Sequence, residues 1–372
     1  MYEIIFCILA SLSILFLVSN DKLSEKDLRI VYIILLIANA IIIALRPEET
    51  PDFLSYKRIY EYIRPGKNYG INLMEREHIT GLEYGFVYLT ALIKYFVGNN
   101  YRLYLFIINI STVFGTIEVM SKLLLELDLI DIEKKTIYRT KLTMACLFFS
   151  YYLINYQGIA IRQAVAFVFC LTAFYYFACN KVVYSIIAYI LAFSMQRMSI
   201  LGVLLVFAYK FFPTFKEKKN YRTICILLFF SFILFDFLDL FTPILAQMQK
   251  VYIWLFGYLN YRGYIEGISM VVIMNRKKIL LLILFGFMVF FIVNKESFIK
   301  LLNVYLLGLI LMIITSNIAG AARIYDYLIM IYVPIIGAQY YEERKNIYYK
   351  IGLVLFVIMN YYVSYRVWTD IV

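Results

Sequence analysis

Apolar runs of about the length of a membrane span follow one another through the whole chain, and they decide its fold class. A helix needs about 20 apolar residues to cross a bilayer, and runs of that order recur from residue 2 to residue 366. Apolar residues make up 63% of the 372 residues, against roughly 45–50% in a soluble domain. Because backbone polar groups must be satisfied within the lipid, these runs predict an all-α, polytopic transmembrane helix bundle.

The runs predict about twelve spans in one integral-membrane domain over residues 1–372. The first run lacks a basic flank and a small-residue cleavage site, so we expect a retained helix rather than a signal peptide. The stretch 182–212 leaves two interpretations open, one long tilted helix or a hairpin that turns at Gln196 and Arg197. The predicted helices are 2–19, 30–45, 103–120, 142–157, 159–179, 182–195, 198–212, 223–241, 279–294, 301–316, 320–340 and 350–366.

A further apolar run, from Gly85 to Val97, is shorter than a span. We expect it to form a short interfacial or re-entrant helix within a long external loop, 46–102. If this run does not cross, the N-terminus lies outside and the short basic loops fall in the cytoplasm, as the positive-inside rule requires. Those basic loops are 20–29, 121–141, 209–222 and 341–349, and the second long external loop is 242–278.

Lysine and arginine divide between the two sides of this predicted topology. Most lysines fall in the cytoplasmic loops, whereas most arginines face outward. Guanidinium is a planar fork suited to phosphate or carboxylate, so the outward arginines favour a phosphate-bearing ligand. Chance combined with snorkelling is the alternative. The net charge of +11 fits a phospholipid surface or an anionic lipid-linked substrate better than nucleic acid, because the basic residues lie between apolar spans.

Three arginines lie in apolar stretches: Arg162 and Arg323 inside predicted spans, and Arg197 at the junction of two of them. A charge at bilayer depth costs about 3 kcal/mol on insertion scales. In the predicted topology all three lie near the outer leaflet, where one anionic ligand would offset them together. Pairing of Arg162 with its own buried acid or carbonyl is the alternative. Arg162 and Gln163 also come near a helix start, where free N–H groups and the helix dipole favour an anion.

The external loops carry the other candidate residues. Asp52 and Tyr56 share one helical face if residues 52–63 are helical. Glu83 precedes an apolar helix, where it could complement the helix dipole or act as a general base. The aromatic segment around Arg262 and Tyr264 suits sugar rings, with an interfacial aromatic belt as the alternative. His78 is the only histidine, and the sequence predicts neither a metal site nor a cofactor.

Four segments in order carry a family resemblance. They are DFLSYKRIYEYI, EYGFVYLTALIKYF, IRQAVAF and AFSMQRMSILGVLL, and ARIYDYL gives a looser match. Together they resemble the EpsG-like, Wzy-type O-antigen polymerases of bacteria over nearly the full chain. In the fourth segment this family usually has a histidine where the chain has Gln196.

The resemblance implies a glycosyltransferase that polymerises undecaprenyl-diphosphate-linked oligosaccharide repeat units on the outer face of the bacterial inner membrane. The product would be O-antigen, the glycan of lipopolysaccharide, or a capsule or exopolysaccharide. Arg162, Arg197 and Arg323 would hold the diphosphate without a metal. Glu83 or Asp52 would accept the proton of the acceptor hydroxyl. The expected substrate-binding side chains are Tyr56, Arg58, Gln163, Gln196, Arg262, Tyr264 and Tyr325.

The expected partners are the lipid-linked glycans and the bilayer, with a chain-length regulator protein as a possible further partner and no nucleic acid. Two alternatives remain open for the function. A lipid-linked oligosaccharide flippase or transporter would also suit about twelve helices, and an O-antigen ligase would share the same donor. A flippase should line a central cavity with charge on both leaflets and show two related halves, neither of which the sequence indicates.

Overall fold

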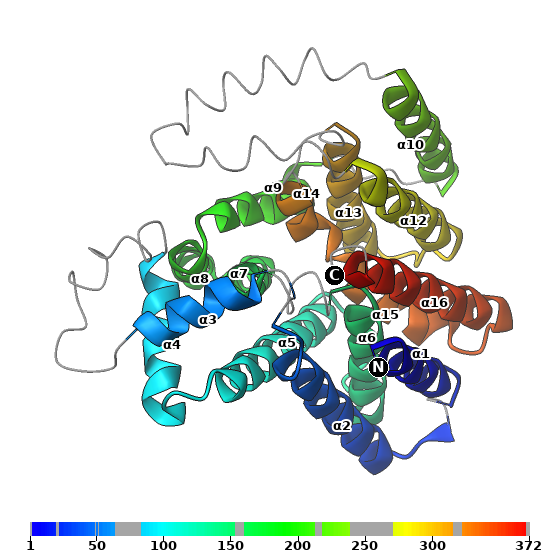
Figure 1. The fold of residues 1–372 in the computed structure, drawn as a ribbon. Helices are drawn as coiled ribbons and strands as arrows, with labels where there is room; N and C mark the ends of the chain where they lie inside the picture. The colour runs from blue at the N-terminus through cyan, green and yellow to red at the C-terminus, as the bar shows by residue number, and fades with distance from the viewer. Residues whose placement is uncertain are drawn as a thin grey trace, which may run out of the picture. The chain divides into compact units, whose positions relative to one another are not determined.

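The computed structural model describes residues 2–19, 22–48, 50, 52–63, 83–152, 160–212, 218–238, 271–314 and 322–369 (Figure 1). Throughout these ranges the regular structure is helical, which confirms the all-α prediction. The helices are α1 (Tyr2–Ser19), α2 (Glu25–Ala44), α3 (Phe53–Tyr62), α4 (Tyr84–Val97), α5 (Tyr101–Glu126), α6 (Lys134–Tyr152), α7 (Ile161–Ala178), α8 (Val182–Met195), the 3₁₀ helix η4 (Arg197–Gly202), α9 (Val203–Phe211), α10 (Lys218–Leu238), α12 (Val271–Phe290), α13 (Glu296–Ile314), α14 (Ala322–Ile329), α15 (Tyr332–Glu343) and α16 (Ile347–Thr369).

Five helices in the described ranges are long and apolar enough to cross a membrane. They are α2, α5, α7, α13 and the Ile347–Tyr365 part of α16. Shorter apolar helices follow at α4, at α8 and at Lys278–Phe290 within α12. These helices support a multi-pass membrane protein, whereas the count of about twelve spans stays a prediction. The other predicted spans are shorter, carry more charge or include residues whose backbone or side chains lie outside the described part of the structure.

The chain divides into two compact units. The single integral-membrane domain stays a prediction. One unit comprises Met1–Val203 and Ile336–Val372, and the other comprises Leu204–Ile335. In the first unit, α5 lies between α2 and α7 (Figure 1), and α7 packs along α8. Asn39 Nδ2 donates to Asn109 Oδ1 at 3.0 Å between α2 and α5. Such hydrogen bonds between buried polar side chains hold apolar helices in register.

The second unit is held together in the same way. Tyr221 OH of α10 donates to Asn303 Oδ1 of α13 at 2.6 Å. Tyr305 OH of α13 donates to the carbonyl of Leu281 in α12 at 2.8 Å. Gly308 of α13 faces α14 closely, because a Cβ atom added to it would lie 2.9 Å from Leu328 Cβ. Small residues and satisfied polar groups therefore set the helix packing here as well.

Two long apolar stretches, 182–212 and 320–340, are each interrupted. The stretch 182–212 is not one long helix, because α8 ends at Met195 and Gln196 takes an extended backbone before η4 begins. Of the two interpretations left open for this stretch, one long helix is therefore excluded, and the hairpin stays a prediction. The span 320–340 is divided between α14 and α15, with a turn at Met330 and Ile331. Pro334, in the first turn of α15, has no N–H to donate, and a proline is tolerated in that first turn but not in a continuous helix.

Within the first predicted external loop, α3 confirms the helix expected at 52–63. Its Phe53, Tyr56 and Tyr60 side chains are buried in a core shared with α4, α5 and α7. Leu54, by contrast, is 46% exposed. The tyrosine side of α3 is therefore packed on protein.

Gly85 lets the first turn of α4 approach the last turn of α8. A Cβ atom added to Gly85 would lie 2.7 Å from the carbonyl oxygen of Ser194 and 2.9 Å from its carbonyl carbon. Main-chain atoms cannot rotate away as a side chain can, so only glycine fits. This contact places Glu83, two residues earlier, beside the break between α8 and η4.

We predict that Gly85→Ala lowers the melting temperature of the purified protein in detergent. The added methyl group forces α4 away from α8, and overpacking of this kind costs about 1–3 kcal/mol. Gly286→Ala is the matched control, because a Cβ atom there would meet Cys225 Sγ at an ordinary 3.6 Å. Equal melting temperatures for the two variants would contradict the close packing of α4 on α8.

Candidate functional site

The carboxylate of Glu83 contacts two other predicted site residues, Arg162 and Arg197, both far from it in the sequence. Glu83 lies at the N-cap of α4, and its side chain is only 3% exposed. Its Oε2 accepts a hydrogen bond from Nη1 of Arg162 at 2.7 Å. Its Oε1 accepts the backbone N–H of Arg197 at 3.1 Å. The structure thus brings together a candidate base and two candidate anion-binding arginines in the first compact unit.

Arg162 is held from two sides at the start of α7. It is the second residue of that helix, where the helix dipole disfavours a cation, and the Glu83 carboxylate offsets this cost. Its Nε also donates to the hydroxyl oxygen of Tyr56 at 3.4 Å. These two contacts use Nε and Nη1 and do not involve Nη2. The Arg162 side chain is 22% exposed, so it is more accessible than the carboxylate it binds.

Arg197 contacts Glu83 through its backbone N–H, at the break between α8 and η4. The extended backbone at Gln196 takes the N–H of Arg197 out of the α8 hydrogen-bond ladder. A backbone N–H that leaves a helix ladder needs another acceptor, and Glu83 supplies one. Glu83 contacts the backbone of Arg197 and not its guanidinium. One carboxylate is therefore placed among two arginines and forms an ion pair with only one of them.

Tyr56 connects this cluster to α3, and Asp52 lies directly before that helix. The buried ring of Tyr56 packs edge-to-face on Phe86 of α4 with centroids 6.0 Å apart. Asp52 precedes α3 in the left-handed backbone region, with φ at 60°, and makes no capping hydrogen bond. Few residues other than glycine occur there, and aspartate is among those that do. The two candidate bases therefore differ, because the carboxylate of Asp52 is exposed and that of Glu83 is enclosed.

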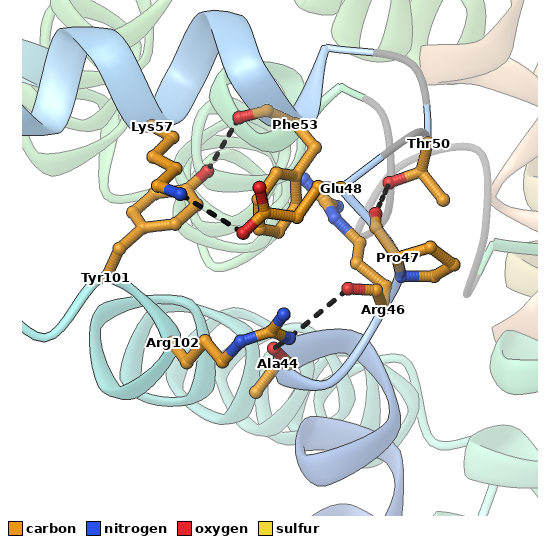
Figure 2. Close-up of polar contacts among 9 residues, drawn as sticks. All are labelled: Ala44, Arg46, Pro47, Glu48, Thr50, Phe53, Lys57, Tyr101 and Arg102. Atoms are coloured by element: carbon orange, nitrogen blue, oxygen red, sulfur yellow. Dashed lines mark hydrogen bonds and ion pairs between the residues drawn. The ribbon is translucent and has the colours of Figure 1, made fainter.

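The sequence did not single out a second arginine pair, which lies beside α3 (Figure 2). Arg46, directly after α2, is 1% exposed, and its guanidinium carbon lies 5.3 Å from the centroid of the Phe53 ring. The guanidinium carbon of Arg102 lies 5.8 Å from the same centroid. Arg102 Nη1 donates to the carbonyls of Ala44 and Arg46 at 2.9 and 3.3 Å, which satisfies the end of α2.

The only sequence signal for Arg46 is its place immediately after an apolar run. Burial lowers the pKa of its guanidinium, although an arginine remains charged in a protein at any ordinary pH. Arg46 is also close enough to Asp52, Tyr56 and Tyr101 to interact with them electrostatically. The sequence analysis singled out only Arg162, Arg197 and Arg323 as intramembrane charges. The surroundings of α3 also contain Arg46 and Arg102, so they carry more positive charge than the sequence predicted.

The remaining predicted residues are spread over the chain. Gln163 is buried in α7 and Gln196 is buried at the helix break, whereas Arg58 is exposed on α3. Tyr325 is buried in α14, in the second unit. Arg323 also belongs to α14, with its side chain outside the described part of the structure, so its place beside Arg162 stays a prediction. Arg262, Tyr264 and His78 lie outside the described residues.

The described cluster offers electrostatic chemistry. It consists of two arginines, one enclosed carboxylate and a tyrosine hydroxyl, and the exposed carboxylate of Asp52 lies one turn before Tyr56 in the chain. Within the described ranges, no three His, Cys, Asp or Glu side chains gather as a metal site would require. Guanidinium groups in a partly enclosed position suit the binding of phosphate or carboxylate oxygens.

Comparison with known proteins gives the family. No curated protein and no solved structure matches the chain. The profile of the EpsG family matches residues 29–370, which includes every residue of the cluster around Glu83. Because this match covers nearly the whole sequence, the chain belongs to the EpsG family.

Proposed function

We propose that this protein is a membrane glycosyltransferase that polymerises undecaprenyl-diphosphate-linked oligosaccharide repeat units. Membership of the EpsG family supports a polysaccharide polymerase in general, and the apolar helices support a multi-pass membrane protein. The proposal adds the lipid diphosphate donor, the O-antigen, capsule or exopolysaccharide product, and independence from metal. It also places the active site on the outer face of the bacterial inner membrane, in a bundle of about twelve spans.

The meeting of Arg162 and Arg197 at the Glu83 carboxylate is the observation that carries this proposal. The cluster contains one more cation than its single enclosed carboxylate can pair with. A positive group in a partly enclosed site is stabilised by an anion, and a diphosphate provides oxygens for more than one guanidinium. Arg323 is proposed as the third arginine that binds the diphosphate.

In the proposed reaction, a hydroxyl group of the acceptor sugar attacks the anomeric carbon of the donor glycan. The bond between that carbon and the diphosphate oxygen breaks, and undecaprenyl diphosphate leaves. The arginines stabilise the negative charge that develops on the diphosphate as the bond breaks. The hydroxyl proton passes to a carboxylate, for which Asp52 and Glu83 are the candidates. Tyr56, Tyr264 and Arg262 are proposed to hold the sugars.

Deleting the gene and separating the surface glycan on a gel tests the function directly. Loss of the polymer ladder with a single repeat unit retained supports the polymerase. Loss of all glycan would instead indicate a flippase. Accumulation of finished polymer on the carrier lipid would indicate a ligase, and both of these results contradict the proposal.

We predict that Arg162→Ala, Arg197→Ala and Arg323→Ala each abolish the polymer ladder in a complemented deletion strain, while capped single repeat units accumulate. Each variant should still reach the membrane, which immunoblotting of the membrane fraction checks. Arg29→Ala is the matched control, because Arg29 is exposed in the first turn of α2 and should not affect the ladder. Normal ladders in all three variants would refute the proposed diphosphate site.

Arg162→Lys tests the geometry of the contact as distinct from its charge. An ammonium group has one nitrogen, so it cannot bind Tyr56 and Glu83 through separate atoms as Nε and Nη1 of Arg162 do. We expect the ladder to be lost in this variant, as in Arg162→Ala. A full ladder would show that positive charge alone is sufficient at this position.

The outward orientation of the site is tested by cysteine labelling in a variant without native cysteines. Ile132→Cys places a thiol in the predicted cytoplasmic loop 121–141, at a side chain that is 84% exposed. Asn99→Cys places one in the predicted external loop, at another exposed position. In intact cells, a membrane-impermeant maleimide should label the Asn99 variant and not the Ile132 variant. The reverse pattern would invert the topology.

A further inference from the structure

The two carboxylates that are candidate bases in the proposed reaction, Asp52 and Glu83, differ in their exposure and in their hydrogen bonds. A general base must come within about 2.6–3.2 Å of the hydroxyl whose proton it takes. The Glu83 side chain is 3% exposed, and each of its oxygens already accepts a hydrogen bond. Asp52 is exposed and has no capping hydrogen bond. A sugar hydroxyl would therefore meet Asp52 directly, but would have to displace Arg162 or the Arg197 backbone to reach Glu83.

The contacts of Glu83 all lead to groups that the proposed diphosphate site needs. Its Oε2 fixes one arm of the Arg162 guanidinium, while Tyr56 OH accepts from Nε at 3.4 Å. Its Oε1 fixes the backbone where η4 begins, and thus the point from which the Arg197 side chain extends. Since the Arg162 side chain is 22% exposed and Glu83 only 3%, a ligand reaches the guanidinium before the carboxylate.

The position of Glu83 is itself fixed by the packing of α4. Gly85 allows the first turn of α4 to lie against the main chain of Ser194 in α8. Phe86, in the same turn, packs on the ring of Tyr56. The carboxylate is thus attached to a helix start that packs on α3 and α8, and it contacts α7 and the α8–η4 break directly.

We propose that Glu83 is a positioning residue that orients Arg162 and Arg197 toward the lipid diphosphate, and not the residue that takes the proton. This inference rests on the function proposed above, and it leaves Asp52 as the base candidate. A guanidinium held at two nitrogens presents its remaining N–H groups in one direction, so less conformational entropy is lost when the diphosphate binds.

The test measures binding of undecaprenyl diphosphate to the full-length protein in lipid nanodiscs, with undecaprenol as the control lipid. Glu83→Gln removes a negative charge near the site, which by charge alone would strengthen the binding of an anion. If Glu83 positions the arginines, Glu83→Gln instead weakens binding by about tenfold, the size of a typical coupling between contacting residues. The Glu83→Gln/Arg162→Ala double variant should then lose less binding than the sum of the two single losses, because Arg162 is one of the two arginines that Glu83 positions.

Asp52→Asn is the matched comparison, because it should bind undecaprenyl diphosphate like the wild type and still lose the polymer ladder. Glu83→Asp is the second variant in case Glu83→Gln does not fold. It keeps the charge but is one methylene shorter, and it should also weaken binding.

Unchanged or tighter binding by a folded Glu83 variant would overturn the positioning role, as would losses that add in the double variant. Failure of the proposed function itself has a different signature. In that case the wild type would bind undecaprenyl diphosphate no better than undecaprenol.

Discussion

The described part of the site depends on one buried carboxylate. It forms an ion pair on α7 and accepts the backbone N–H at the α8–η4 break. Glu83 compensates the Arg162 guanidinium with one oxygen and the Arg197 backbone N–H with the other. Removing one partner of a buried ion pair typically costs about 3–5 kcal/mol, because the other charge is left without compensation. The positions of α4, α7 and η4 are therefore linked through one side chain.

The break in the α8 hydrogen-bond ladder explains why such a link is needed. A helix that breaks inside a lipid-embedded fold exposes backbone groups that water cannot satisfy there. At Gln196 the chain leaves the α8 ladder, and the next N–H finds its acceptor on a different helix. The break thus depends on α4, and α4 can approach only because position 85 is a glycine. An irregular segment with a satisfied backbone is a suitable place to carry a charged side chain.

The sequence predicted most of the helices and part of the site. Apolar runs located the helical regions because burial in lipid needs a run of fixed length, and the face shared by Tyr56 and Tyr60 followed from helical periodicity. The pairing of Glu83 with Arg162 could not be predicted, because the two residues are 79 positions apart and no local pattern encodes their contact. Arg46 was missed for the same reason, since its ring partner Phe53 belongs to the next helix.

The structure also changes the energetic argument for the arginines. The sequence left two ways of offsetting Arg162 open, an anionic ligand shared with Arg197 and Arg323 or a buried acid of its own. The structure shows the second, with Glu83 as the buried acid. Arg102, beside the site, is stabilised by the carbonyls at the end of α2 and by the ring of Phe53. These arginines therefore need no ligand to be tolerated in the fold. A diphosphate would meet guanidinium groups already held in place, so little of its binding energy would be spent on ordering them, and more would remain to stabilise the charge that develops on the leaving group.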